Sequence, residues 1–381
     1  MKKNVGVFFG SRSAEHDVSI TSAFVVMKWL IKAGYNVLPI YINQKGKWLY
    51  NKDFSDIKKI KDADNTGMEL SIKLGEVDNK MHLEQSKKGL FSGKEQIDLD
   101  IAFHVLHGLA GEDGSIQGLC ELVGIPYVGP GILGGSTTLD KIITKDIFVS
   151  NNLPIVPYIH FEKGNANLSD IEIKLNYPMF VKPYNLGSSI GVSKVENTEE
   201  LKNAIEVAEH YSNEIIVEEG VNNLIELNCA VCEKDSEVIT TLVEQPTTNA
   251  NFLSFEEKYI VTDNGGGTMS GNETKVHIPA LIPENIALDI QEMSKKIFKI
   301  FKLGGAPRID YLYDEKNDKL YVNEINPIPG AMQMHLWEKS GLSQIDFMHT
   351  LIASAVAQND RRNVNTEFKS NILDHTISFM K

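Results

Sequence analysis

The stretch GGAPRIDYLYDEKNDKLYVNEINPIPG, residues 304–330, predicts two β-strands joined by a tight turn. Arg308 and Asp310 are two residues apart on the first strand, so their side chains share a face. Glu324 and Asn326 have the same spacing on the second strand. If the strands pair across the turn, one surface collects an arginine, two carboxylates and an amide.

This set of side chains fits a cation site beside an anion site. Mg²⁺ binds proteins through one or two carboxylates together with substrate phosphates. Arg308 could hold a phosphate or an oxyanion next to that cation. The alternative is an exposed hairpin with ordinary salt bridges. The Pro-Ile-Pro-Gly run after Asn326 favours the cation site, because it fixes the backbone just beyond the carboxylate.

Composition restricts the class of protein. A chain of 381 residues is too long for one simple core and predicts two or three domains. The formal net charge of −13 argues against nucleic acid or an anionic membrane as partner, while it permits nucleotide binding in a local basic pocket. We find no signal-peptide pattern and no apolar run of bilayer length, and we expect a cytoplasmic protein.

The first part of the chain has the pattern of an α/β unit. VGVFFG (5–10) predicts a buried strand, residues 18–33 a helix and NVLPIYI (36–42) the next strand. This opening unit lacks the G-x-G-x-x-G motif of a dinucleotide-binding fold, and no G-x-x-x-x-G-K-[ST] motif of a P-loop occurs in the sequence. Residues 43–98 are polar and weakly periodic, and we interpret them as a hairpin and surface insertion.

Two polar positions follow predicted elements of this unit. His107 comes at the end of the buried strand LDIAFHVLHG (99–108), where open α/β sheets place ligands, although it could equally be an ordinary loop histidine. A helix is predicted over residues 136–152, with Lys141 and Lys145 one turn apart. We place the first domain boundary near Gly134.

The segment YPMFVKPYNLGSSIGVSKV (177–195) predicts a hairpin with a glycine- and serine-rich loop. Small residues let backbone N–H groups approach phosphate oxygens, and the hydroxyls of Ser188 and Ser189 add donors. Lys182 on the preceding strand could reach the same anion. Many glycine–serine turns are only turns, so the nearby lysine is what favours a phosphate site.

The remaining predictions concern a helix, a long loop and a pair of cysteines. A helix is predicted over residues 198–211 with Thr198 as its N-cap. The sequence predicts a long glycine-bearing loop over residues 246–275, typical of an active-site lid, which carries Lys258 and Tyr259. Cys229 and Cys232 are three residues apart on a predicted strand and so face opposite sides, which favours core cysteines over a redox or zinc pair.

The chain resembles the D-alanine–D-alanine ligase family in the order and number of its matching segments. These are SAEHDVS, LHGLAGEDGSIQGLCELVGIPYVG, LDKIITK, FVKPYNLGSSIGVSKV, IIVEE, EEKY, RID and NEINPIPG. The resemblance covers nearly the whole chain and is weakest over residues 43–98. It implies an α/β fold of three-domain ATP-grasp architecture with an N-terminal Rossmann-like domain. The domains expected are 1–133, 134–217 and 218–381, with ATP between the second and third.

The resemblance also implies a reaction and its residues. Such ligases phosphorylate a first D-alanine with ATP, and a second D-alanine then displaces the phosphate, for peptidoglycan precursor synthesis. Glu15, Ser188 and Tyr259 match a substrate-binding triad, His107 matches a residue of the same pocket, and Arg308 matches the group that stabilises the tetrahedral intermediate. Family members are commonly homodimers, so a homodimer is expected.

Further positions match nucleotide, metal and acceptor residues of the family. The nucleotide positions are Lys141, Lys182, Ser189, Glu218, Glu219, Val221, Glu226 and Lys258. Asp310, Glu324 and Asn326 match the ligands of Mg²⁺ or Mn²⁺, with two ions expected. Gly330, His335 and Leu336 match the acceptor pocket.

One departure concerns the acceptor. His335 stands where the family pattern has a serine that holds the carboxylate of the second substrate. A protonated histidine can hold a carboxylate, which would make acceptor affinity depend on pH. The change either keeps the serine's role or alters the acceptor to D-serine, D-lactate or another group. A catalytically inactive nucleotide-binding protein is a third reading, which the presence of every predicted metal ligand and lysine disfavours.

Overall fold

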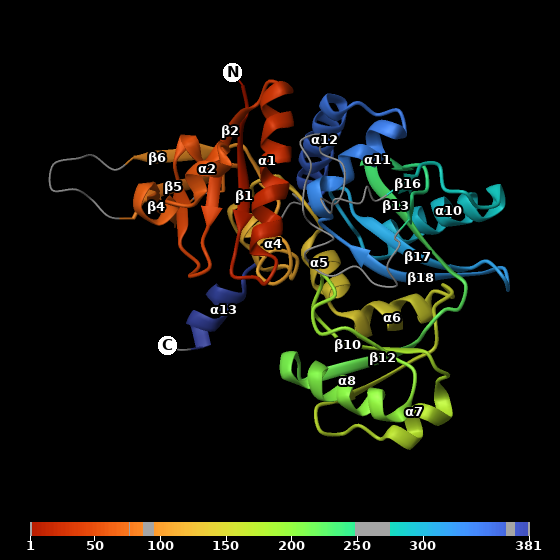
Figure 1. The fold of residues 1–381 in the computed structure, drawn as a ribbon. Helices are drawn as coiled ribbons and strands as arrows, with labels where there is room; N and C mark the ends of the chain where they lie inside the picture. Colours follow the sequence, from red (N-terminus) through yellow and green to blue (C-terminus); the bar gives the residue numbers. More distant parts are fainter. Residues whose placement is uncertain (1, 76, 87–94, 248–274, 363–369, 380–381) are drawn as a thin grey trace.

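The structure, a computed structural model, describes residues 2–75, 77–86, 95–247, 275–362 and 370–379. Its N-terminal domain is built on an eight-stranded sheet with the order β6-β5-β4-β3-β2-β1-β7-β8 (Figure 1). The strands are β1 (Asn4–Gly10), β2 (Asn36–Ile42), β3 (Trp48–Tyr50), β4 (Met68–Lys73), β5 (Met81–Gln85), β6 (Gln96–Leu99), β7 (Ile101–His104) and β8 (Tyr127–Val128). β1, β2, β7 and β8 pair in parallel, and α1 (His16–Lys32) connects β1 to β2. The predicted β-α-β opening is confirmed.

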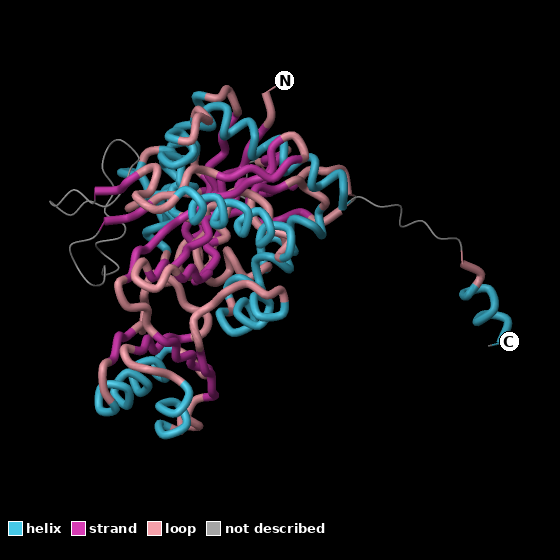
Figure 2. Tube along the Cα trace, turned by 90° about the vertical axis from the view of Figure 1, so that its right-hand side faces the viewer, coloured by secondary structure: helices cyan, strands magenta, loops and turns pink. Residues whose placement is uncertain are grey.

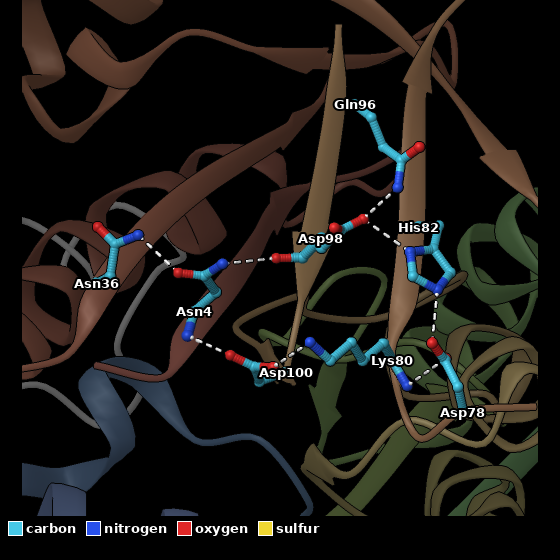
Figure 3. Close-up of polar contacts among 8 residues, drawn as sticks. All are labelled: Asn4, Asn36, Asp78, Lys80, His82, Gln96, Asp98 and Asp100. Atoms are coloured by element: carbon cyan, nitrogen blue, oxygen red, sulfur yellow. Dashed lines mark hydrogen bonds and ion pairs between the residues drawn. The ribbon is translucent and has the colours of Figure 1, made fainter. Parts of the chain in front are cut away.

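Residues 43–98 differ from the predicted surface insertion. They contribute β3, β4, β5 and part of β6, which extend the sheet by antiparallel pairing, together with the short helices η1 (Lys52–Ser55), α2 (Ile57–Ile60) and α3 (Ala63–Thr66). Polar side chains hold the edge strand β6 in place. His82 on β5 contacts the side chain of Asp98 on β6, and the Asn4 side chain of β1 donates to the backbone oxygen of Asp98 (Figure 3). The weak periodicity reflects short strands with one exposed face.

The central domain is a four-stranded antiparallel sheet, ordered β11-β10-β12-β9 and covered by α7 and α8. Its elements are β9 (Tyr158–Glu162), α7 (Leu168–Lys174), β10 (Met179–Pro183), β11 (Ser193–Val195), α8 (Thr198–Tyr211) and β12 (Glu214–Glu219). The predicted hairpin of β10 and β11 is confirmed. The predicted cap of α8 is wrong by one residue, because the side chain of Asn197, not Thr198, accepts the N–H of Glu200.

The predicted single helix over residues 136–152 is two helices, α5 (Ile132–Leu139) and α6 (Lys141–Ser150). Asp140 separates them, because its side chain caps α6 by accepting the N–H groups of Ile142 and Ile143. The helix α4 (Ser115–Val123) precedes them. The predicted boundary near Gly134 falls within α5, and the one between residues 217 and 218 falls within β12.

The C-terminal domain has a four-stranded antiparallel sheet, ordered β14-β13-β17-β18, and a separate pair of β15 and β16. Its elements are β13 (Leu224–Lys234), β14 (Glu237–Thr240), β15 (Gln245–Thr247), β16 (Lys275–His277), α10 (Glu284–Ile300), β17 (Arg308–Asp314), β18 (Lys319–Asn326), η2 (Gly330–Gln333), α11 (Met334–Lys339), α12 (Gln344–Arg362) and α13 (Ile372–Phe379). The predicted hairpin is β17 and β18. Cys229 and Cys232 are buried in different core clusters, as alternation along β13 requires.

The hydrophobic cores do not follow the division of the molecule into three sheet-based domains, because one core is shared by two of them. One cluster combines Val5 and Ala23 of the N-terminal domain with Cys232 and Phe347 of the C-terminal domain. The central domain has a cluster of its own, which includes Val181 and Leu201, and it forms a separate lobe in both views (Figures 1 and 2). Among the described residues, no helix combines the length and apolar character needed to cross a bilayer.

Candidate active site

The start of α1 meets the glycine- and serine-rich loop of the central domain. Ser188 donates a hydrogen bond to Glu15, although the two are 173 residues apart in sequence. Glycines allow this approach: a Cβ at Gly187 would lie 3.1 Å from both Glu15 carboxylate oxygens. Gly108 has φ of +70°, and a Cβ there would lie 2.8 Å from Oε2 of Glu15. Two predicted triad members therefore touch, while Tyr259 lies outside the described residues.

Two lysines converge on Glu218 of β12. The carboxylate contacts Nζ of Lys182 at 2.7 Å and Nζ of Lys145 at 3.1 Å. Burial would raise the pKa of Glu218, but the two lysine charges lower it to about 2. Glu218 and Glu324 likewise hold the pKa of Lys182 above its usual range against the effect of burial. The group forms a fixed, positively charged wall that can take phosphate oxygens.

Lys141 stands between the domains. Its Nζ donates to the backbone oxygen of Leu186 at 2.6 Å, which ties α6 to the glycine- and serine-rich loop. Burial lowers the pKa of Lys141, whereas the charges of Glu324 and Glu15 oppose that effect. The charge of Lys141 thus interacts with Glu15 of the N-terminal domain and with Glu324 of the C-terminal domain.

The β17–β18 hairpin brings its polar side chains together as predicted. Arg308 binds Asp310 through two bonds, Nε to Oδ1 at 2.6 Å and Nη2 to Oδ2 at 2.7 Å. Asn326 donates to the same carboxylate at 2.9 Å, and Glu324 is the direct cross-strand neighbour of Asp310. The arginine therefore has a fixed orientation at the carboxylate pair.

We tested whether this hairpin fits a divalent cation. Burial raises the pKa of Asp310; Arg308 opposes that shift, and the charge of Glu324 adds to it. Two adjacent carboxylates that repel one another, with an amide oxygen nearby, are a donor set that suits Mg²⁺ or Mn²⁺. Across the described part of the chain, no cluster of three His, Cys, Asp or Glu side chains forms a metal site. A cation here would therefore also need Asn326 and phosphate oxygens.

His107 lies beyond the end of β7 and is buried, which lowers its pKa to about 4. Its Nε2 is 3.3 Å from the Ser22 hydroxyl of α1. The same hydroxyl accepts the backbone N–H of Ala331 at 3.1 Å, directly after Gly330. The neutral imidazole thus lies beside the loop that carries the predicted acceptor residues.

His335 has a partner that the sequence did not indicate. Its Nε2 lies 2.7 Å from Oε1 of Glu244, a carboxylate that is 3% exposed and also accepts a bond from Asn228. Burial would raise the pKa of Glu244, but the bond to His335 lowers it below its usual value. Leu336 is fully buried in the core, so its side chain packs inward.

The other predicted nucleotide residues have varied surroundings. Glu219 accepts bonds from the backbone and side chain of Asn176, and Val221 lies two residues beyond the end of β12. Glu226 lies on β13, and its charge contributes to the raised pKa of Lys182. Ser189 has φ of +61° in the glycine- and serine-rich loop. Lys258 lies outside the described residues.

Sequence reasoning missed three buried groups at this site: Glu112, Lys145 as a partner of Glu218, and Glu244. Glu112 is 9% exposed, and burial together with the charge of Glu15 raises its pKa to about 8. For Lys145 the available signal is its position one helical turn after Lys141. For the two glutamates the sequence carries no signal, because Ile328 and His335, which link them to the C-terminal part of the site, are distant from them in the chain.

Comparison with known proteins identifies the family. The model for the N-terminus of D-ala D-ala ligase matches residues 4–130, and the model for its C-terminus matches residues 147–353. The chain belongs to the D-alanine–D-alanine ligase family. The D-alanine–D-alanine ligase of Thermosipho melanesiensis is 37% identical over 92% of this chain and 92% of its own length. That of Caldicellulosiruptor bescii is 35% identical over 95% of this chain and 97% of its own length.

Solved ligases of the family have the same fold. The D-alanine-D-alanine ligase of Coxiella burnetii superposes with a TM-score of 0.77 at 25% identity, covering 95% of this chain and 96% of its own. The VanG D-Ala:D-Ser ligase of Enterococcus faecalis gives 0.76 at 29% identity, with coverage of 93% and 100%. The predicted α/β ATP-grasp class is confirmed.

Proposed function

We propose that this chain is an ATP-dependent ligase that joins two D-alanines through a D-alanyl-phosphate, for peptidoglycan precursor synthesis. The observation that carries the proposal is the Ser188–Glu15 contact. It brings the glycine- and serine-rich loop of the central domain, for which we propose phosphate binding, against Glu15, for which we propose binding of the first substrate. Family membership supplies ATP as co-substrate and ADP formation.

The reaction needs an activated carboxylate, because an amine cannot displace the oxygen of a free carboxylate. A carboxylate oxygen of the first D-alanine attacks the γ-phosphorus of ATP, and ADP leaves. The amine of the second D-alanine then attacks the acyl carbon. The C–N bond forms, the bond from carbon to the phosphate oxygen breaks, and phosphate departs as the amine loses a proton to solvent.

The residues of the candidate site fit these steps. Glu15 binds the ammonium group of the first substrate and is oriented by Ser188. Lys141 and Lys182 hold phosphate oxygens, and Arg308 offsets the charge of the tetrahedral intermediate. Asp310, Glu324 and Asn326 would hold Mg²⁺ or Mn²⁺, with two ions expected, and such ions supply positive charge against the phosphates.

A second candidate keeps this mechanism and changes the acceptor. The specific observation is the His335–Glu244 pair, which puts an imidazole and a buried carboxylate where a hydroxyl was expected. An acceptor such as D-serine, whose hydroxyl can bond either group, would suit this pocket. The likeness to a D-Ala:D-Ser ligase is compatible with that candidate.

The test is ADP release with Mg²⁺ and D-alanine alone, with the product identified by mass. Dipeptide formation supports D-alanine as acceptor and makes His335 a tolerated substitution. Release that requires D-serine, D-lactate or another acceptor supports the second candidate. Folded protein that releases no ADP with any pair would contradict both.

Arg308→Ala separates binding from chemistry. Removing the guanidinium should lower kcat by about a hundredfold or more, as for loss of one preorganised oxyanion donor, while ATP affinity stays largely intact. Equilibrium nucleotide binding and steady-state turnover measure the two effects. Loss of ATP binding in a folded variant would show that the assigned role is wrong.

We further propose that the enzyme is a cytoplasmic homodimer, as is common in the family, with D-alanine and ATP as its partners. Sedimentation equilibrium of the purified chain tests the oligomeric state. A single species at the monomer mass of 42.5 kDa across the concentration range would contradict the dimer.

A further inference from the structure

Glu112 joins two loops that belong to different domains. Its Oε2 accepts the N–H of Gly108 at 2.8 Å, in the loop after β7. Its Oε1 accepts the N–H of Ile328 at 3.1 Å, in the loop after β18. We call Glu112, Gly108 and Ile328 the Glu112 clasp. One buried carboxylate therefore sets the spacing between segments that lie 216 residues apart in sequence.

The two loops in the clasp carry candidate substrate residues. His107 is the neighbour of Gly108, and Gly330 follows Ile328 by two residues. A second link runs parallel to the clasp, because the Ser22 hydroxyl contacts both His107, at 3.3 Å, and the N–H of Ala331, at 3.1 Å. Both links act on the same pair of loops.

The loop after β18 has a backbone that needs outside support. Ala331, Met332 and Gln333 have φ of 45°, 54° and 52°, three successive non-glycine residues in the left-handed region. Each such residue costs about 1–2 kcal/mol relative to a right-handed conformation. Contacts from the N-terminal domain, including the clasp, oppose the relaxation of this turn, and His335 follows it by two residues.

Burying a carboxylate at this position is energetically unfavourable. Glu112 is buried beside the charge of Glu15, and a like charge in a buried place is unfavourable. A neutral side chain of similar size could pack there at lower cost, but glutamine would accept only one of the two N–H groups and aim its own donor at the other. The N–H groups of Gly108 and Ile328 favour the ionised form and so oppose this cost, and only a carboxylate has an acceptor oxygen for each of them.

We propose that Glu112 is a positioning residue for the ligation: through Gly108 and Ile328 it fixes the first-substrate wall of the site against the acceptor wall. The proposal rests on the proposed function for its catalytic consequence. Its structural part, the clasp itself, does not depend on the identity of the substrates.

Glu112→Gln tests the proposal with little change in shape. We expect the acceptor KM to rise about tenfold or more, because a small misplacement of two reacting groups is costly. Backbone amide exchange should accelerate in segments 105–112 and 327–333. ATP affinity should stay within about twofold, because Lys182 and Glu218 lie in the central domain, away from the clasp.

Asp113→Asn is the matched control. Asp113 is the next residue and accepts the N–H groups of Ala110, at 2.9 Å, and of Ser115, the first residue of α4, at 3.0 Å, so both bonds are local in sequence. It should leave the acceptor KM and the exchange of segment 327–333 unchanged. Ser22→Ala, which removes the parallel link without a change of charge, should reproduce the Glu112→Gln effect on the acceptor KM if the spacing of the loops matters.

The outcomes are separable. Unchanged exchange in both segments, or an unchanged acceptor KM in an active enzyme, would overturn the positioning role. A parallel loss of ATP affinity would also overturn it, since that indicates general damage to the fold. If the wild-type chain ligates no acceptor, the proposed function fails, and exchange at the two segments still decides whether the clasp exists.

Discussion

Two ionised clusters in this molecule have the same plan, one charge held between two of the opposite sign. Glu218 contacts Lys182 at 2.7 Å and Lys145 at 3.1 Å. At the far edge of the N-terminal sheet, His82 contacts two aspartates at the same pair of distances, 2.7 Å and 3.1 Å (Figure 3). The side chains around Glu218 are 2–14% exposed, whereas those around His82 are 24–48% exposed.

Because the distances are the same, the exposure to water should decide how much each cluster contributes to the free energy of unfolding. The attraction between two charges at about 4 Å is roughly 1 kcal/mol in water and several-fold larger near a protein interior. A buried charge that loses its partner is also left without solvation. The Glu218 cluster should therefore be hard to break, and the His82 cluster should be weak and sensitive to salt.

The largest effect should come from Glu218→Ala. It leaves two lysines buried and unpaired, which costs about 3–5 kcal/mol of unfolding free energy. Urea unfolding at neutral pH measures the loss. Glu219→Gln, on the next residue of the same strand, is the control and should cost about 1 kcal/mol, because it keeps a polar contact to Asn176. Equal losses for the two variants would contradict the role of burial.

The pH dependence of the unfolding free energy gives a second test of the Glu218 cluster. The folded-state pKa of Glu218, about 2, lies below the ordinary value of 4.5. Its stabilising contribution is therefore complete above about pH 4.5 and is lost as the pH falls toward 2. Subtracting the Glu218→Ala unfolding free energy from that of wild type, across acid pH, should show this difference shrink over that window. A difference that stays constant down to pH 2 would contradict the shift.

An intermediate effect is expected for His335→Ala. The pair with Glu244 is half-buried, with side-chain exposures of 28% and 5%. Removing the imidazole takes one partner from a buried carboxylate that keeps Asn228, so we expect a loss of about 1–3 kcal/mol. Urea unfolding gives the loss, and steady-state kinetics should place the functional effect on the acceptor rather than on ATP. An effect on ATP KM alone would contradict the placement of His335 in the acceptor pocket.

The smallest effect should come from His82→Gln. The bond to Asp98 raises the pKa of His82 despite partial burial, so its contribution is present below about pH 6.5 and is lost as the pH rises through the raised folded-state pKa. We expect at most about 1 kcal/mol at pH 6, less in 1 M salt, and no difference at high pH. Thermal unfolding at two pH values tests this. A larger loss would mean that the cluster is less hydrated than its exposure indicates.

Local patterns in the sequence were enough to predict local structure. Alternation along one strand correctly assigned Cys229 and Cys232 to opposite faces, and the spacing of Arg308 and Asp310 correctly placed them together on one surface. The division of the helix at Asp140 was missed, although the residue is a good N-cap, because its neighbours are also compatible with one continuous helix.

Apart from Glu15 and Ser188, which the family resemblance brought together, contacts between distant segments were not predicted from the sequence. Glu112 and Glu244 are ordinary glutamates in loops until the fold puts Ile328 beside one and His335 beside the other. The strands of residues 43–98 were missed for a related reason. Each is short and acquires its stability from the neighbouring strand, so no single segment has a strong period.

The hydrophobic cluster shared by the N- and C-terminal domains decides which parts of the chain can fold separately. A fragment that ends near residue 130 would lack Phe347 and Leu351 of α12 and would expose the apolar faces of α1 and β8 that this helix contacts. Such a fragment should aggregate unless the other part is co-expressed. The piece that could be grafted between relatives is instead the middle of the chain, β9 to β12, whose core is its own. The first and last thirds would have to be exchanged as one unit.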